Sequence, residues 1–196
     1  MRELKSICVF CGSSEGNDTI IISQAEALGE TLAKQNLTLI YGAAKIGIMG
    51  KIAQASLHKK GKVIGVIPEF LKLKEVVHLG LSELITTKNM HERKLKMHEL
   101  SDGFMTLPGG FGTFEELFEI ITWAQLGLHQ KPIGLLNING FYDDLISMLD
   151  TMVAKGFLKM ENFDLLLVDD TIEGLLTKMK AFKPQSVPKW LKADRT

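Results

Sequence analysis

The chain has no excess of charge, no long hydrophobic run and only two cysteines, and each absence excludes a class of protein. Its 196 residues include 23 Lys or Arg and 23 Asp or Glu, so the formal net charge is zero. Proteins that grip the nucleic-acid backbone over a broad surface need a basic excess. No apolar stretch reaches the roughly 20 residues that span a membrane. We therefore expect no nucleic-acid partner and no membrane partner.

The two cysteines, Cys8 and Cys11, have the C-x-x-C spacing of some redox and metal sites. A redox pair needs a helix N-terminus that stabilises the thiolate, whereas these residues lie in the apolar run SICVFC. That run is typical of a strand, in which alternate side chains point to opposite faces. Divergent thiols are thus favoured over a redox pair. A second cysteine pair and a zinc-type histidine spacing are both missing, so we expect no metal and no cofactor.

Length and composition favour one globular unit. A chain of this size with 45% hydrophobic residues can build one full core. We expect a single domain over residues 1–182 and a peripheral tail over residues 183–196, where Pro184 and Pro188 interrupt regular structure. The N-terminal segment MRELKSICVF has too short an apolar part for a signal peptide, so we expect a cytoplasmic protein.

Short apolar runs alternate with amphipathic runs along the chain. Nearly continuous apolar runs are typical of strands buried on both faces of a parallel sheet. The alternation predicts an α/β fold, a Rossmann-like doubly wound parallel sheet of about seven strands flanked by helices. We expect strands at residues 5–11, 37–41, 62–67, 82–87, 103–107, 132–137 and 164–168, and helices at 18–35, 47–60, 89–101, 113–127, 141–155 and 170–182.

Three loops follow predicted strands, at the sheet edge where ligands bind in this class of fold. They are residues 11–17 (CGSSEGN), 41–51 (YGAAKIGIMGK) and 107–113 (LPGGFGT). All three offer small residues, hydroxyl groups or unpaired N–H groups, although any one of them could be an ordinary tight turn. Neither the P-loop pattern nor the dinucleotide-binding pattern is matched.

The third loop leads directly into a predicted helix. Gly109, Gly110 and Gly112 let a ligand approach the backbone closely. Because the first N–H groups of a helix lack partners and favour anions, we expect a phosphate to bind at a helix that begins at Thr113.

Two carboxylates lie in the first turn of this helix. At about 100° per residue, Glu116 falls on the apolar side near Ile120 and Trp123, whereas Glu115 falls on the polar side. One interpretation is a capping box between Thr113 and Glu116. The other is that Glu116 faces a pocket and acts in proton transfer or in stabilising a cation. The two interpretations are compatible.

Arg93 lies in an apolar stripe of the preceding predicted helix, beside Met90 and Met97. An unpaired buried charge is costly, so this arginine needs a partner. A structural carboxylate could supply it, or the side chain could reach water. The alternative is an anion clamp on phosphate, which suits the planar guanidinium and which Lys94 could assist.

The helix that follows Thr113 is apolar around most of its circumference, which is typical of burial on two sides. One side would contact the sheet. We expect the other to contact a second subunit in a homodimer, with burial inside a monomer as the alternative.

Two motifs resemble a known family. PGGFGTFEE (residues 108–116) matches the PGGxGTxxE motif of the LONELY GUY (LOG) family, and MHERK (90–94) matches its Arg-Lys signature. VFCGSS, IGIMG, GVIPEFL and ITWAQLG are also similar to family segments, so the resemblance extends from about Lys5 to about Phe182. One departure is the turn after the second predicted strand, where Gly42-Ala43-Ala44-Lys45 replaces a Gly-Gly-rich turn.

The resemblance implies a cytokinin riboside 5'-monophosphate phosphoribohydrolase. Such an enzyme hydrolyses the N-glycosidic bond of N6-modified adenosine monophosphates, or of AMP, to the free base and ribose 5-phosphate. By motif position, the catalytic residues would be Arg93 and Glu116. The substrate contacts would be Glu75, Lys94, Gly110, Phe111, Gly112, Thr113, Phe114, Glu115 and Thr122, with Ser13 and Gly47 added from the other two loops. The alternative is a non-catalytic nucleotide-binding or cofactor-carrier protein of the same fold.

Overall fold

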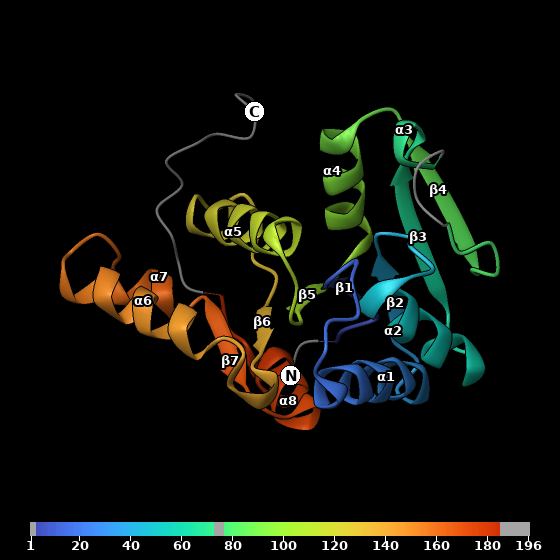
Figure 1. The fold of residues 1–196 in the computed structure, drawn as a ribbon. Coiled ribbons are helices and arrows are strands. Elements are labelled where there is room, and N and C mark those ends of the chain that lie inside the picture. Colours follow the sequence, from blue (N-terminus) through green and yellow to red (C-terminus); the bar gives the residue numbers. More distant parts are fainter. Residues whose placement is uncertain (1–2, 73–76, 185–196) are drawn as a thin grey trace.

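A sheet of seven parallel strands organises the computed structural model, which describes residues 3–72 and 77–184 (Figure 1). The strands are β1 (Ser6–Phe10), β2 (Thr38–Tyr41), β3 (Val63–Pro68), β4 (Glu83–Thr87), β5 (Gly103–Thr106), β6 (Ile133–Leu136) and β7 (Leu166–Asp169). Their order across the sheet is β4-β3-β2-β1-β5-β6-β7, and every neighbouring pair is parallel. The predicted fold class is confirmed, and each predicted strand is present with its ends shifted by two residues or fewer.

Helices connect the strands. They are α1 (Thr19–Lys34), α2 (Gly47–His58), α3 (Glu69–Lys72), α4 (Met90–Leu100), α5 (Phe111–Gln125), α6 (Asp143–Ala154), α7 (Met160–Phe163) and α8 (Ile172–Ala181), with a 3-10 turn, η1, at Ile138–Gly140. The six predicted helices are present. The short helices α3 and α7 were not predicted, because a single turn is too short to show a periodic pattern.

The helices form two layers, one on each face of the sheet. Figure 1 shows α1, α2 and α8 on one side and α4 and α5 on the other. Alternate residues of β1 enter the two cores: Ile7 and Val9 pack with the first layer, and Cys8 and Phe10 with the second. Cys8 and Cys11 belong to different cores, so the thiols diverge as the strand pattern predicts, and both are free and buried.

The strand order reverses between β1 and β5. The chain builds outward from β1 to β4, and α4 then returns it across the sheet to β5 on the other side of β1. A ligand crevice is expected at the carboxyl ends of strands that flank such a reversal. The loops after β1 and β5 meet there, where the Gly12 N–H donates to the Pro108 carbonyl over 3.1 Å.

Two of the predictions fall on residues that the structure does not describe. Glu75 lies outside the described residues, as does the predicted tail from residue 185 onward. Within residues 3–72 and 77–184, no helix combines the length and the apolar character needed to cross a membrane.

Candidate active site

Helix α5 begins at Phe111, two residues before the predicted start at Thr113. Gly110 is the N-cap, with an extended backbone and no side-chain cap. The glycine at position 112 is tolerated in the first turn because that turn makes few internal hydrogen bonds. The sequence pattern therefore placed the start of the helix two residues too late. Thr113 is therefore inside the helix, and the predicted capping box with Glu116 does not form.

A cavity of about 240 Å³ lies between the start of α5, the helix α4 and the carboxyl ends of the central strands. All three predicted loops contribute to it. Its lining residues are Val9, Cys11, Ser13, Gly42, Met49, Arg93, Met97, Gly110, Phe111, Gly112, Thr113 and Glu116. Glycines 110 and 112 have open space where a side chain would stand, so a ligand can reach the first N–H groups of α5.

Glu116 is the partly buried carboxylate of this cavity. Burial raises its pKa from the ordinary 4.5 to about 7, because the charged form loses water contact. The Arg93 guanidinium opposes that rise, and the Glu115 carboxylate adds to it. A carboxyl group with a pKa near neutrality can donate or accept a proton at physiological pH.

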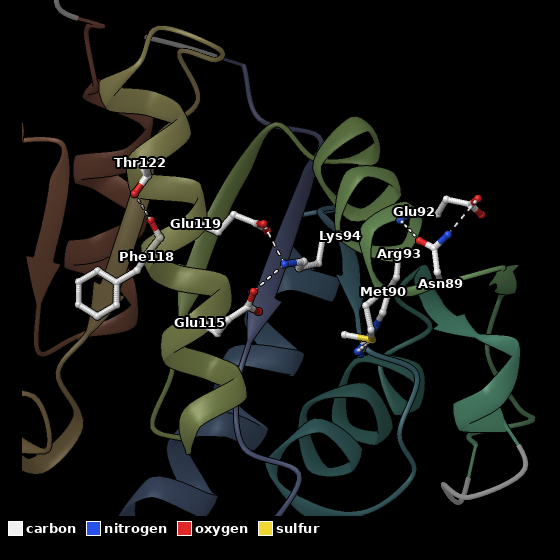
Figure 2. Close-up of polar contacts among 9 residues, drawn as sticks. All are labelled: Asn89, Met90, Glu92, Arg93, Lys94, Glu115, Phe118, Glu119 and Thr122. Carbon is white, nitrogen blue, oxygen red and sulfur yellow. Dashed lines mark hydrogen bonds and ion pairs between the residues drawn. The ribbon is translucent and has the colours of Figure 1, made fainter. Parts of the chain in front are cut away.

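Arg93 is 7% exposed and is held by main-chain carbonyl groups. Its Nε donates to the Val66 carbonyl over 3.1 Å, and its Nη2 donates to the Gly42 carbonyl over 3.3 Å. Its Nη1 also lies 3.8 Å from the Met90 sulfur (Figure 2). Within the described part of the chain, no carboxylate forms an ion pair with Arg93. Its charge is therefore available to an anionic ligand in the cavity.

Lys94 reaches from α4 to α5. Its Nζ lies 2.6 Å from Glu115 Oε1 and 2.8 Å from Glu119 Oε1, so one ammonium group bridges α4 and α5 (Figure 2). Burial alone would lower the pKa of Lys94, but these two hydrogen bonds outweigh it and raise that pKa. The structure thus gives Lys94 carboxylate partners rather than a place in the cavity lining.

The structure brings together only part of the predicted residue set. Seven of those residues line the cavity: Ser13, Arg93, Gly110, Phe111, Gly112, Thr113 and Glu116. Lys94, Glu115, Phe114, Thr122 and Gly47 do not. Phe114 packs edge-on against the Tyr142 ring, and the Thr122 hydroxyl donates to the Phe118 carbonyl over 2.7 Å. Gly47 has a φ of 66° and lies against the Ser13 backbone, so it shapes the loop beside the cavity.

Several lining residues were not predicted from the sequence. Three of them, Gly42, Met49 and Met97, lie in segments that the sequence had already indicated. Gly42 and Met49 belong to the predicted loop after β2, and Met97 lies one turn beyond Arg93 on the same stripe. Cys11 also lines the cavity, and burial followed by the nearby Glu116 charge raises the pKa of its thiol well above the usual range. A thiol held in this neutral form is a poor nucleophile.

The turn that departs from the family pattern is strained and buried. Ala43 has a φ of 66°, a conformation that costs a non-glycine residue about 1–2 kcal/mol. Its carbonyl accepts from the His78 N–H over 3.0 Å, and Ala44 pairs with Val77, so a following segment holds the turn in place. Lys45 is exposed and does not line the cavity.

Comparison with curated proteins shows the chain's relatives. The family model described as "Possible lysine decarboxylase" matches residues 49–179. The chain is 43% identical over 190 residues to the cytokinin riboside 5'-monophosphate phosphoribohydrolase LOG2 of Arabidopsis thaliana, covering 94% of this chain and 89% of that protein. It is 45% identical over 182 residues to the probable cytokinin riboside 5'-monophosphate phosphoribohydrolase LOG6 of the same plant, covering 92% and 90%.

Solved structures share the architecture at low sequence identity. The molybdenum cofactor binding protein from Rippkaea orientalis has a TM-score of 0.68 at 22% identity, covering 92% of this chain and 98% of that one. DNA processing protein A from Helicobacter pylori has a TM-score of 0.58 at 14% identity, covering 91% and 81%. At these identities the likeness concerns the fold alone.

Proposed function

Because the chain belongs to the LONELY GUY family of cytokinin riboside 5'-monophosphate phosphoribohydrolases, we propose that it hydrolyses the N-glycosidic bond of a nucleoside 5'-monophosphate. The substrate is an N6-modified adenosine monophosphate or AMP, and the products are the free base and ribose 5-phosphate. One observation carries the proposal: an arginine without an ion-pair partner in the described chain and a carboxyl group with a raised pKa face one cavity at a helix start.

The substrate phosphate binds at the start of α5. The N–H groups of Phe111 and Gly112 have no partner inside the helix, and the helix dipole favours an anion there. Gly110 and Gly112 leave room for close approach. Binding energy gained at the phosphate orients the ribose over Glu116, which lies farther along the same helix.

Cleavage of a glycosidic bond passes through a cationic, oxocarbenium-like sugar. The ionised Glu116 carboxylate stabilises that charge or takes a proton from the attacking water. The water oxygen ends on the sugar carbon and a proton ends on the departing base, so the reaction consumes one water and no other reactant. Arg93 holds the anionic end or orients Glu116.

Incubation with AMP and with N6-isopentenyl-AMP, followed by chromatography of the free base, tests this proposal. Glu116→Gln and Arg93→Ala should each reduce base release by at least about 100-fold, since each removes a group that acts in the transition state. Glu26→Gln, an exposed change on α1, is the matched control and should release base at the wild-type rate. Unchanged turnover in both site variants would refute the assignment.

A non-catalytic nucleotide-binding or carrier protein of this fold is the rival function. It would bind AMP without releasing adenine, so equilibrium binding measured beside turnover separates the two. A pyridoxal-type lysine decarboxylase would need a lysine at its reaction centre, and none of the described residues that line the cavity is a lysine.

We also propose a cytoplasmic homodimer, in which α5 contributes to the interface. Phe118 on α5 is 40% exposed, and Met160 and Phe157 near α7 are 54% and 85% exposed. Phe118 also lines a small apolar groove of about 160 Å³ between α5, α6 and α7. A second copy would cover this surface.

Light scattering tests the assembly, with the 21.8 kDa chain mass as reference. The wild type should have twice that mass, and Phe118→Glu should have the mass of one chain because a charge would be buried at the interface. A monomeric wild type would contradict the dimer proposal.

A further inference from the structure

We infer that Gly42 is a positioning residue for Arg93. Its missing side chain lets the guanidinium lie directly against the main chain at the end of β2, facing the cavity. The inference rests on the proposed function, because the consequence for turnover depends on Arg93 acting in the site. The position of the guanidinium itself can be measured without turnover.

The first observation is the kind of partner that Arg93 has. Its guanidinium donates to two neutral carbonyl groups, from Val66 on β3 and from Gly42 just after β2. A carbonyl group fixes the direction of a guanidinium but leaves its positive charge uncompensated, whereas a carboxylate would neutralise that charge. The main chain of two adjacent strands therefore orients a cation and keeps it available to a ligand.

The second observation is the space at Gly42. A Cβ atom at this position would overlap Arg93 Nη2 and would stand 3.0 Å from the Met49 sulfur. Gly42 is not among the residues with positive φ, so backbone freedom does not explain a glycine there. The missing side chain leaves the room that the guanidinium occupies, which is the tightest of the contacts that a Cβ atom would make there.

The third observation concerns what would move if a side chain were added. The overlapping atom is the far end of a flexible side chain, so the fold can accept the change by displacing the guanidinium. The backbone is less free to yield, because the next residue, Ala43, is bonded through its carbonyl to the His78 N–H. Gly42→Ala should therefore displace Arg93 while the protein stays folded.

The experiment compares Gly42→Ala with Gly80→Ala, a control in an exposed turn where an added Cβ atom would meet only the His78 ring, at 3.3 Å. We expect kcat/KM for base release from AMP to fall by about 10- to 100-fold in G42A, as for a small misplacement of a catalytic group. G80A should retain the wild-type value. Both variants should keep a thermal unfolding midpoint within a few degrees of the wild type.

A double-mutant cycle separates positioning from general damage. In an Arg93→Lys background the planar fork that meets Gly42 is gone, so adding G42A should lower kcat/KM little further. An equal loss in both backgrounds, or full activity in G42A alone, would overturn the inference.

A second readout does not depend on turnover. The Arg93 guanidinium lowers the pKa of Glu116, so that pKa, followed by NMR of ¹³C-labelled glutamate, reports where the guanidinium lies. The titration of Glu116 should shift in G42A and R93K but not in G80A. If the wild type released no base, the proposed function would fail, and this titration would still decide the role of Gly42: an unshifted G42A would refute it.

Discussion

At the scale of single residues, Glu116 is a trade-off between the stability of the fold and the function of the site. Its folded-state pKa is about 7, above the ordinary 4.5, so the folded protein binds a proton there that the unfolded chain has already lost. The free energy of unfolding must therefore fall as pH rises from about 4.5 to 7. A site that keeps this carboxyl group in a buried cavity gives up stability for reactivity.

We predict that Glu116→Gln is more stable than the wild type at pH 8, by about 1–3 kcal/mol, because a neutral amide avoids the cost of a buried charge. At pH 4 the gain should disappear, since Glu116 is then protonated in both the folded and the unfolded states. Urea denaturation at the two pH values measures the difference, with Glu26→Gln as the exposed control. An equal gain at both pH values would contradict the pKa assignment.

At the scale of elements, the Lys94 ammonium group links α4 to α5. Lys94 bridges Glu115 and Glu119 and lowers the pKa of Glu116, whereas those two carboxylates raise it. The bridge therefore ties the helix that carries Arg93 to the helix that carries Glu116. It also offsets two like charges beside the reactive carboxyl group.

We predict that Lys94→Met raises the pKa of Glu116 and moves the acidic limb of the pH–rate profile to higher pH. The ionised carboxylate is the active form, so activity at pH 6 should fall more than activity at pH 8. Lys96→Met is the matched control, because Lys96 pairs with Glu99 within α4 and makes no ion pair with α5. A uniform loss across pH would indicate a purely structural bridge.

The same scale shows which elements could be predicted from the sequence. Apolar runs fix the seven strands, and the 3.6-residue period places Arg93 and Glu116 on the buried sides of their helices. The start of α5 was misplaced, because Gly112 looks like a helix breaker and is harmless in a first turn. The Lys94 bridge and the carbonyl groups that hold Arg93 depend on the distance between elements that are remote in sequence, which no local pattern contains.

At the scale of the whole molecule, the reversal between β1 and β5 gathers the site from segments far apart in the chain. The cavity joins Ser13 after β1, Gly42 after β2, Arg93 on α4 and Glu116 on α5. A ligand that fills it contacts parts of the chain that only the intact sheet holds together. Binding should therefore stabilise the entire fold rather than one loop.

We predict that ribose 5-phosphate raises the thermal unfolding midpoint of the wild type, which cannot consume this ligand because it has no glycosidic bond. At 100 times the dissociation constant, about 2.7 kcal/mol of stabilisation corresponds to a rise of roughly 5–10 °C for a chain of this size. Ribose without phosphate should raise it far less, because the free N–H groups at the start of α5 recognise the anion. An equal rise with ribose alone would place the main binding energy on the sugar and would contradict phosphate recognition by α5.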